Sequence, residues 1–397
     1  MRRTNRALAI TLVLLAVFTA VLLTLAAFNG PKLKTVTYNA ARLTTLKAQR
    51  VSVALNQRIQ EINADSVKIT PAADFKLQTR GAQIVFTFEK PLQASTGYTL
   101  ELTAKSAATG AASQISATIT TDPMPVTALI PHGSSADPSE ADRIVQSSVG
   151  GKTQPQTVLR APAISEFTTA GQWAAAITKP AGKRDLLLLV QKFDGTEPAY
   201  IPQPPSKEPR QLQFSSDGSL LGVRFFDGVN DELMLYSLAG IKSGIGNAVM
   251  DKDGKILHVK DWYFEQGSSV AHILTVAGAT YRVPYGGRAE PSTKPWPATS
   301  ATTLPQNLPL TGGGSVEING RELALKHPGK PAQTLYTPAA ASSTLTGLCL
   351  APNKQYVAAQ VQPAGGEVPQ LAIINLKTGL PALSTPGMRP DWCQIRR

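Results

Sequence analysis

The chain has 397 residues, more than one small hydrophobic core usually organises, so two or three domains are expected. Its 31 glycines and 30 prolines are spread along the sequence, and only 17% of the residues are charged. This composition is rich in turns without being collagen-like or disordered, and it excludes a peptide hormone or a single small module. The net charge of +12 includes no dense basic run, so it indicates solubility and weak attraction to anions.

The first 30 residues predict a membrane anchor. The 22 residues from Ala7 to Phe28 carry no charge, and as a helix they would be about 33 Å long, enough for the roughly 30 Å hydrocarbon core of a bilayer. The preceding arginines place the N-terminus in the cytoplasm and the bulk of the chain outside it, by the positive-inside bias. These arginines are Arg2, Arg3 and Arg6.

Two alternatives for this segment stay open. A cleaved secretory signal usually has an apolar stretch of about 7 to 15 residues, shorter than the stretch found here. A buried helix of a globular domain is the other alternative, although a helix that is apolar on every face would need a core all around it. We predict an uncleaved, single-pass anchor in residues 1–30.

Two cysteines, Cys349 and Cys393, are the candidate pair for a disulfide. They are the only cysteines, and both lie in the part of the chain expected to meet an oxidising environment. A disulfide between them would close a loop of about 44 residues, which stabilises a protein by about 4 kcal/mol in the chain-entropy model. The alternative is that both are small buried thiols.

Residues 31–122 predict a β-sandwich. Short runs with alternating apolar residues recur at close spacing, as in Ile84, Phe86 and Phe88, and glycine, proline and polar turns separate them. Such alternation is typical of antiparallel strands with one buried face. The runs are 51–55, 66–70, 83–88, 98–103 and 114–120.

The stretch from Gly81 to Thr121 resembles the C-terminal half of bacterial Ig-like domains of the S-layer-protein type. Those domains place an apolar strand before a Pro-Leu pair and a Thr-x-Tyr-Thr motif, and the matching residues here are Pro91, Leu92, Thr96, Tyr98 and Thr99. The front half, from Arg50 to Ala72, is also similar to that family. The resemblance implies a spacer or adhesion module without chemistry of its own.

Prolines after Asp122 interrupt the strand pattern, so we place a domain boundary there. The run Asp137-Pro138-Ser139-Glu140 has the pattern of a helix N-terminus, with a capping residue, proline at the first position and glutamate three residues after the cap. It predicts one short helix through Val145.

An internal repeat organises residues 123–397. The runs Phe167–Trp173 and Phe214–Leu220 each combine an aromatic residue, small hydroxyl residues, a glycine turn and the start of an apolar strand, and they begin 47 residues apart. Leu350–Tyr356 fits the same frame, Tyr263–Ser269 fits more loosely, a degenerate copy is expected near residue 306, and Trp392 marks a last start. Repeats of about 40 to 50 residues made of strands are typical of a β-propeller. We count about six blades, with five or seven as alternatives.

The Phe-Ser-Ser-Asp-Gly run at 214–218 resembles the strand-and-turn motif of TolB-type, WD-repeat-like propellers, although Ser216 replaces their proline. The last start, at Trp392, has no blade after it. We therefore expect strands between Val126 and Pro162 to complete that blade, so that both chain ends close the ring without an open edge strand.

A search for catalytic, cofactor-binding or metal-binding residues yields none that we assign. The four histidines, at 132, 258, 272 and 327, have no ligand spacing and are expected on the surface or in loops. Asp251 and Asp253 predict a hairpin turn, since the further oxygen ligands of a calcium loop are missing. No Gly-x-Ser-x-Gly nucleophile motif occurs, and Gly151-Lys152-Thr153 lacks the first glycine of a phosphate-binding loop.

Two weaker signals point to carbohydrate. Asp227, Asp231 and Glu232 provide carboxylates that could act as a pair in a glycosidase-like propeller, against the simpler interpretation as a solvated loop. Trp296, in the proline-rich run Lys294–Pro297, could be exposed and stack on a sugar.

These observations favour a membrane-anchored, extracytoplasmic binding or scaffold protein of the cell envelope. The propeller would be a non-catalytic platform for an envelope protein or a wall polymer. The alternatives are a propeller hydrolase that acts on envelope polysaccharide and a purely structural subunit of a membrane assembly. Nucleic acid is disfavoured as a partner by the location.

Overall fold

A computed structural model describes residues 14, 15, 17, 29–132, 141–151, 154–179, 185–265, 267–296, 304–310 and 313–393. The chain divides into two compact units, Met1–Met124 and Pro125–Arg397. The predicted anchor lies outside the described residues except for Leu14, Leu15 and Val17. Within the ranges given above, no helix combines the length and the apolar character needed to cross a membrane.

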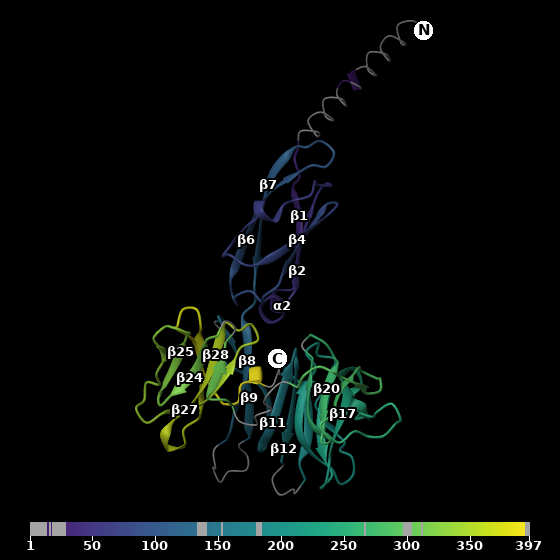
Figure 1. Ribbon diagram of the computed structural model, residues 1–397, viewed down its shortest axis with the longest axis vertical. Helices are drawn as coiled ribbons and strands as arrows, with labels where there is room; N and C mark the ends of the chain where they lie inside the picture. Colours follow the sequence, from purple (N-terminus) through teal and green to yellow (C-terminus); the bar gives the residue numbers. More distant parts are fainter. Residues whose placement is uncertain are drawn as a thin grey trace. The chain divides into compact units, whose positions relative to one another are not determined.

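The first unit is a β-sandwich of two sheets (Figure 1). One sheet has the strand order β1-β2-β5-β4 and the other has the order β3-β6-β7. The strands are β1 (Leu33–Thr37), β2 (Gln49–Leu55), β3 (Lys68–Thr70), β4 (Phe75–Arg80), β5 (Gln83–Phe88), β6 (Gly97–Lys105) and β7 (Ala112–Thr120), with one short helix, α2 (Ala40–Thr45).

The alternation read from the sequence sets the core of this sandwich. Ile84, Phe86 and Phe88 of β5 are at most 1% exposed, as predicted, while the residues between them are exposed or half-buried. They pack with buried side chains of both sheets, among them Val53 and Leu100. All five predicted runs lie in or overlap strands, and β1 and β4 were not predicted.

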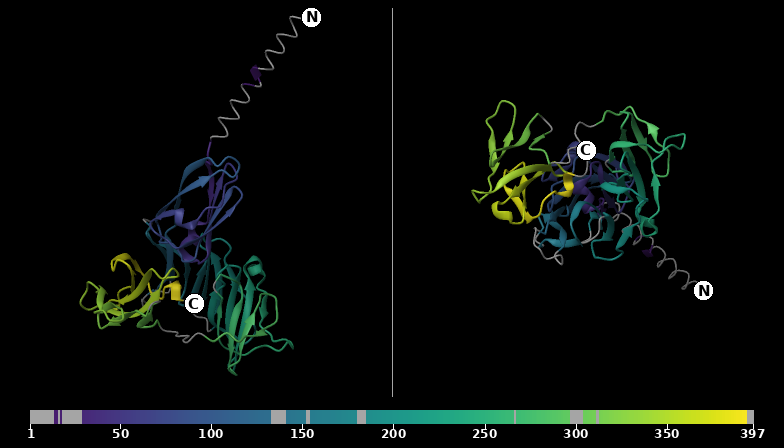
Figure 2. Two further views of the ribbon diagram at one scale, coloured as in Figure 1. Left: turned by 45° about the horizontal axis from the view of Figure 1, so that its top comes forward. Right: turned by 90° about the horizontal axis from the view of Figure 1, so that it is seen from below.

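The second unit consists of six consecutive sheets, counted over the described residues, which we call blades 1 to 6. Within each blade the strands follow one another in antiparallel order, and Figure 2 shows the sheets in turn around the unit. This is the architecture of a β-propeller. The blades are β8–β10 (Met124–Ile130, Asp142–Val149, Gln156–Ala161), β11–β14 (Ile164–Ala170, Trp173–Thr178, Leu187–Lys192, Ala199–Ile201), β15–β18 (Glu208–Phe214, Leu220–Phe226, Asp231–Ser237, Gly246–Ala248), β19–β22 (Val259–Phe264, Ala271–Thr275, Thr280–Val283, Glu290–Pro291), β23–β26 (Asn307–Pro309, Ser315–Asn319, Glu322–Lys326, Gln333–Tyr336) and β27–β30 (Thr344–Leu350, Tyr356–Gln362, Gln370–Asn375, Pro381–Pro386).

The repeated motif is the hairpin between the first and second strands of a blade. In blade 3, Asp217 accepts hydrogen bonds from the backbone N–H and the hydroxyl of Ser219, at 3.1 and 2.8 Å, and Gly218 has φ +72°. Only glycine adopts this left-handed conformation without strain, which explains the glycine in the repeat. The degenerate copy expected near residue 306 is blade 5, whose first strand, β23, has only three residues.

The predicted short helix is wrong where the structure describes it. Residues 133–140 lie outside the described residues, but Asp142–Val149 form strand β9. Ile144 and Ser147 are buried on this strand, which pairs with β10 on one side and lies beside β8 on the other. Tertiary pairing overrides the local helix-start pattern here.

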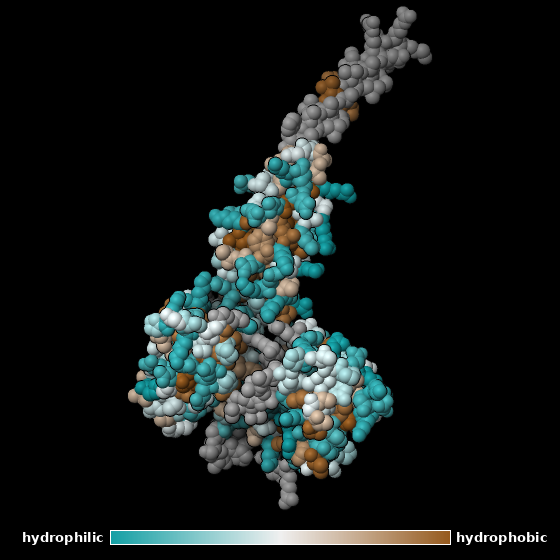
Figure 3. Space-filling view, viewed as in Figure 1, coloured by the Kyte–Doolittle hydropathy of each residue, from teal (hydrophilic) through white to brown (hydrophobic). Residues whose placement is uncertain are grey.

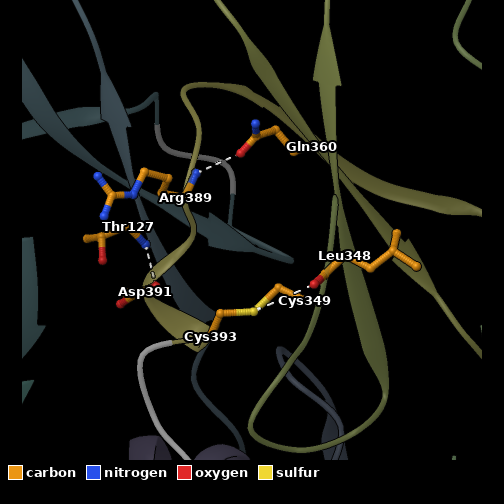
Figure 4. Close-up of a disulfide and its surroundings, with 7 residues drawn as sticks. All are labelled: Thr127, Leu348, Cys349, Gln360, Arg389, Asp391 and Cys393. Atoms are coloured by element: carbon orange, nitrogen blue, oxygen red, sulfur yellow. Dashed lines mark hydrogen bonds between the residues drawn. A yellow bond between two sulfur atoms is a disulfide. The ribbon is translucent and has the colours of Figure 1, made fainter. Parts of the chain in front are cut away.

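The two ends of the second unit meet in blade 1. The backbone of Met388 exchanges two hydrogen bonds with Leu129 of β8, at 2.8 and 2.9 Å. The C-terminal segment therefore pairs with the edge of β8 that β9 leaves open. The indole of Trp392 donates to the carbonyl of Pro125 at 2.8 Å. A disulfide joins Cys393 to Cys349 of β27, and so ties the same segment to blade 6 (Figure 4).

The packing between neighbouring blades is not uniform. Apolar clusters join blade 1 to 2, blade 2 to 3, blade 3 to 4 and blade 5 to 6. In blade 4 the apolar residues pack on blade 3, and in blade 5 they pack on blade 6. The side chains of Arg282 and Glu290 in blade 4 and of Lys326 in blade 5 are 45%, 64% and 50% exposed. Apolar packing therefore joins four pairs of neighbouring blades, and the closing segment joins blade 6 to blade 1 through backbone pairing and the disulfide.

Candidate functional site

The first strands of the blades lie nearest the centre of the ring. β11 contacts β15, β15 contacts β19, and β23 contacts β27. The short 3-10 helix η4 (Asp391–Cys393) contacts both β27 and β11 and so lies between blades 6 and 2. Except for β8, whose second edge pairs with Met388, each first strand pairs on only one edge within its sheet, with the second strand of its own blade, so its other edge faces the centre.

Four of these first strands carry a β-bulge at the same position. The register with the second strand shifts by one residue between Ile164 and Glu166, and equivalent shifts occur in β15, β19 and β27. A bulge leaves one residue out of the ladder and redirects its side chain. The bulged residues are Ser165, Arg210, Lys260 and Thr346, and all four are exposed although their strand neighbours are largely buried.

Hydrogen bonds connect these bulges across blades. In blade 6, Gln360 Nε2 donates to Thr346 Oγ1 at 2.9 Å, and Gln360 Oε1 accepts from the backbone N–H of Arg389 at 3.0 Å (Figure 4). The Arg389 guanidinium donates to the carbonyl of Ser165 at 2.6 Å and to the carboxylate of Glu166. The closing segment therefore links blade 6 to blade 2 through polar side chains.

The same arrangement recurs between blades 3 and 4. Arg224 Nη1 donates to the carbonyl of the bulged Lys260 at 2.9 Å, and its Nε lies 4.0 Å from a carboxylate oxygen of Asp231. An arginine from the preceding blade thus holds the bulge carbonyl in both places. We call the set Ser165, Glu166, Arg210, Arg224, Lys260, Thr346, Gln360 and Arg389 the polar ring.

The electrostatics of the polar ring show which charges are already neutralised. Burial raises the pKa of Glu166, and the positive charges of Arg389 and Arg224 oppose this rise. Asp231 lies beside Arg224, and Glu232 forms an ion pair with Lys207. These three acids, Glu166, Asp231 and Glu232, therefore each have a cation beside them.

Two cations of the polar ring are left over. The guanidinium carbon of Arg210 lies 3.4 Å from the centre of the Phe226 ring, a stacked geometry that leaves the donor edges of the guanidinium open. Neither Arg210 nor Lys260 forms a side-chain ion pair with an acid of the described ranges. Both are exposed, so the polar ring offers two cationic groups from adjacent blades.

The carboxylates suggested by the sequence do not form a paired acid and base. Asp227 accepts from the backbone N–H groups of Val229 and Asn230, at 2.8 and 2.7 Å, which closes a turn and lowers its pKa. Asp231 and Glu232 lie beside Arg224 and Lys207. These three acids thus have structural partners, which favours the simpler interpretation of this loop.

Trp296 is not an exposed sugar platform. Its indole N–H donates to Asp261 at 3.2 Å and its ring meets that of Tyr263 edge-on, with centroids 5.1 Å apart. His272, expected on the surface or in a loop, is only 5% exposed because it lies on β20 and stacks on Tyr263. Burial disfavours the charged imidazolium and so lowers the pKa of His272. Both residues belong to the packing of blade 4.

Asp251 makes the predicted hairpin turn. One of its carboxylate oxygens accepts from the backbone N–H groups of Asp253 and Lys255, each at 2.9 Å. Over the ranges described, no cluster of histidine, cysteine, aspartate and glutamate has the makings of a metal site. Cys349 and Cys393 are joined, with their Cα atoms 5.5 Å apart.

The polar ring was not predicted from the sequence. Its residues come from five blades, and their common position depends on the strand register rather than on a shared residue type. The one available signal was spacing, because Arg210, Lys260 and Thr346 each lie four residues before the last residue of a first strand.

Comparisons with known proteins find solved structures that are only distantly similar to this chain. No family model matches the sequence, and no curated protein matches it. TolB from Acinetobacter baumannii is 13% identical over 84% of this chain and 86% of its own, with a TM-score of 0.39. The β-propeller domain of the Trilobed protease from Pyrococcus furiosus is 8% identical over 91% of this chain and 99% of its own, with a TM-score of 0.31. An auxiliary nutrient binding protein from Bacteroides thetaiotaomicron is 6% identical over 91% and 71%, with a TM-score of 0.23. At these values the likeness supports no inference about ligand or activity.

Proposed function

We propose that the protein is an envelope binding or scaffold protein, and that the polar ring at the centre of its propeller contacts the partner. The observation that supports this is the repeated bulge, which exposes one side chain per blade in strands whose other residues are mostly buried. A feature repeated at one level in blades 2, 3, 4 and 6 provides several contact groups for one ligand. Bulges of this kind are frequent next to functional sites.

Binding is favoured over catalysis by the way the acids are used. Hydrolysis of a glycosidic bond needs two carboxyl groups flanking one bond, one of them free to give up a proton. Glu166 is held by Arg389, Glu232 by Lys207, and Asp227 by backbone donors. We therefore propose a non-catalytic platform.

The hydrophilic surface fits a polar recognition mode. Figure 3 shows that the visible face of the second unit is mainly hydrophilic, with hydrophobic residues in small separate spots. Large apolar patches usually mark protein interfaces of the hydrophobic type. Recognition through polar and charged groups of the ring is the mode that this surface favours.

A photo-crosslinking experiment tests the proposal. A photoreactive phenylalanine analogue replaces the exposed bulge residue Ser165, and in a matched control it replaces Lys377, which is exposed in the β29–β30 turn. We expect irradiation of cells to join a specific partner to the Ser165 variant and not to the Lys377 variant. Equal labelling from both positions, or none from either, contradicts the proposed role of the ring.

We further propose that residues 7–28 anchor the protein in the cytoplasmic membrane with both units outside it. The support is the uncharged 22-residue segment and the three preceding arginines. The disulfide fits an oxidising compartment. After alkaline carbonate extraction, we expect the full-length protein to remain in the membrane pellet. A soluble mature chain that begins near Phe28 would show a cleaved signal instead.

A further inference from the structure

The two surplus cations of the polar ring lie at the same level of neighbouring blades. Arg224 connects them, because it pairs in register with Gln211, next to the bulged Arg210, and donates at 2.9 Å to the carbonyl of Lys260. The stacking of Arg210 on Phe226 holds its guanidinium in place without using its hydrogen-bond donors. A guanidinium held on one blade and an exposed ammonium on the next blade can each bind a carboxylate.

The surrounding charges support an anionic ligand. The acids of the ring and its rim are engaged, Glu166 with Arg389, Asp231 beside Arg224 and Glu232 with Lys207. The exception is Glu208, an exposed residue of β15 that lies two positions before Arg210. A negatively charged ligand would therefore be attracted by Arg210 and Lys260, and the exposed carboxylate of Glu208 would oppose it.

From this geometry we propose that the polar ring binds an acidic peptide segment of a partner protein, with Arg210 and Lys260 as the carboxylate contacts. This deepens the proposed binding function and rests on it. We choose a peptide over a bulky polymer because first strands such as β15 and β19 pair on only one edge within their sheets and leave the backbone groups of the other edge toward the centre of the ring. Such groups can pair with peptide backbone amides while the cations bind the side chains.

The experiment measures binding of a fluorescein-labelled hexaglutamate peptide to the full-length chain in detergent, by fluorescence anisotropy at low salt. Hexaglutamine with the same label is the uncharged reference. We expect hexaglutamate to bind and hexaglutamine not to, and we expect added salt to weaken the binding because exposed charges are screened. Equal binding of the two peptides overturns the proposal.

Charge-removing variants locate the site. Arg210→Gln and Lys260→Gln should each weaken hexaglutamate binding about tenfold, the value of one charge-assisted contact. Arg160→Gln and Lys377→Gln remove exposed cations elsewhere in the second unit and should have no effect. Glu208→Gln should strengthen binding. An unchanged melting temperature verifies folding of each variant, and unchanged binding by both Arg210→Gln and Lys260→Gln overturns the proposal.

Two further outcomes separate this inference from the function on which it rests. If the Ser165 photo-crosslink captures a partner equally well in the Arg210→Gln/Lys260→Gln background, the acidic-peptide inference fails and the binding function stands. If no partner is captured at all, the binding function fails. Polygalacturonate, a glycerol-phosphate polymer and unlabelled hexaglutamate are also compared as competitors of the labelled peptide. If either polymer displaces it at a lower concentration than hexaglutamate does, the ligand is a wall polymer and the acidic-peptide inference is overturned.

Discussion

At the scale of single residues, Asp391 is the group on which the closing segment depends. One of its carboxylate oxygens accepts the backbone N–H of Thr127 at 2.9 Å and the other accepts the hydroxyl of Thr169 at 2.9 Å. The side chain thus connects the C-terminal segment to blades 1 and 2. Burial raises the pKa of this carboxyl despite these hydrogen bonds.

This pKa shift predicts how Asp391→Asn changes the pH dependence of stability. Because the pKa is higher in the folded chain, the folded state binds a proton more readily, and the free energy of unfolding falls as pH rises from about 4 through the folded pKa. Asparagine cannot titrate, so the stability of the variant relative to the wild type should increase over the same interval. Denaturant titrations at a series of pH values measure this difference.

Asp391→Ala is the matched control for the hydrogen bonds. It leaves two donors without their acceptor and should be about 1 to 3 kcal/mol less stable than Asp391→Asn at every pH, because neither variant titrates at this position. The titration of Glu166, whose pKa is also raised, is common to all three proteins and cancels in the comparison. Parallel stability curves for wild type and Asp391→Asn would contradict the assignment.

Individual residues were also where sequence interpretation was least reliable. His272 was expected on the surface or in a loop because it shows no metal-ligand spacing, yet it lies on a strand, is buried and stacks on Tyr263. Trp296 follows a proline and precedes another, a context typical of an exposed loop, but Asp261 and Tyr263 hold it. Both contacts join residues that are distant in sequence, which no local pattern reports.

At the scale of elements, the repeat predicted the hairpins because each needs the same turn chemistry. Gly171, Gly218 and Gly267 all have positive φ, and each is visible in the sequence, whereas in blade 6 the equivalent turn position is Lys354 with φ +58°. The bulges in the first strands were not predicted. A bulge is a property of two paired strands, so Arg210 and Lys260 look like ordinary strand residues until the register is known.

The packing of strands β16 and β19 leads to a prediction about Gly222. A Cβ atom at this position would lie 2.5 Å from the buried ring of Trp262, which has no room to move. Gly222→Ala should therefore destabilise the second unit by about 1 to 3 kcal/mol through overpacking between blades 3 and 4. Thermal unfolding followed by tryptophan fluorescence measures the change.

Gly240→Ala provides the control within the same blade. The nearest atom to its added Cβ would be the hydroxyl of Ser243 at 3.9 Å, an ordinary contact. This variant should unfold close to the wild type. Equal destabilisation by both variants would indicate a general backbone effect and would contradict the role of Trp262.

At the scale of the whole molecule, the chain contains two compact units with separate cores, so we expect two unfolding transitions. The disulfide belongs entirely to the second unit, where it ties the closing segment of blade 1 to strand β27 of blade 6. Its 44-residue separation corresponds to about 4 kcal/mol in the chain-entropy model. In a unit of this size, that free energy corresponds to a shift of about 10 °C in melting temperature.

Calorimetry with and without a reducing agent checks this prediction. Reduction should lower the melting temperature of the second unit and leave the first unchanged, because the sandwich contains no cysteine. Cys349→Ala/Cys393→Ala should melt at the lower temperature in both conditions and so serves as the control for other effects of the reductant. If reduction leaves both transitions in place, the backbone pairing of Met388 with Leu129 and the contacts of Asp391 and Trp392 are sufficient to close the ring. In that case the covalent tie adds no stability to the closing segment, and the noncovalent contacts of blade 1 carry the closure alone.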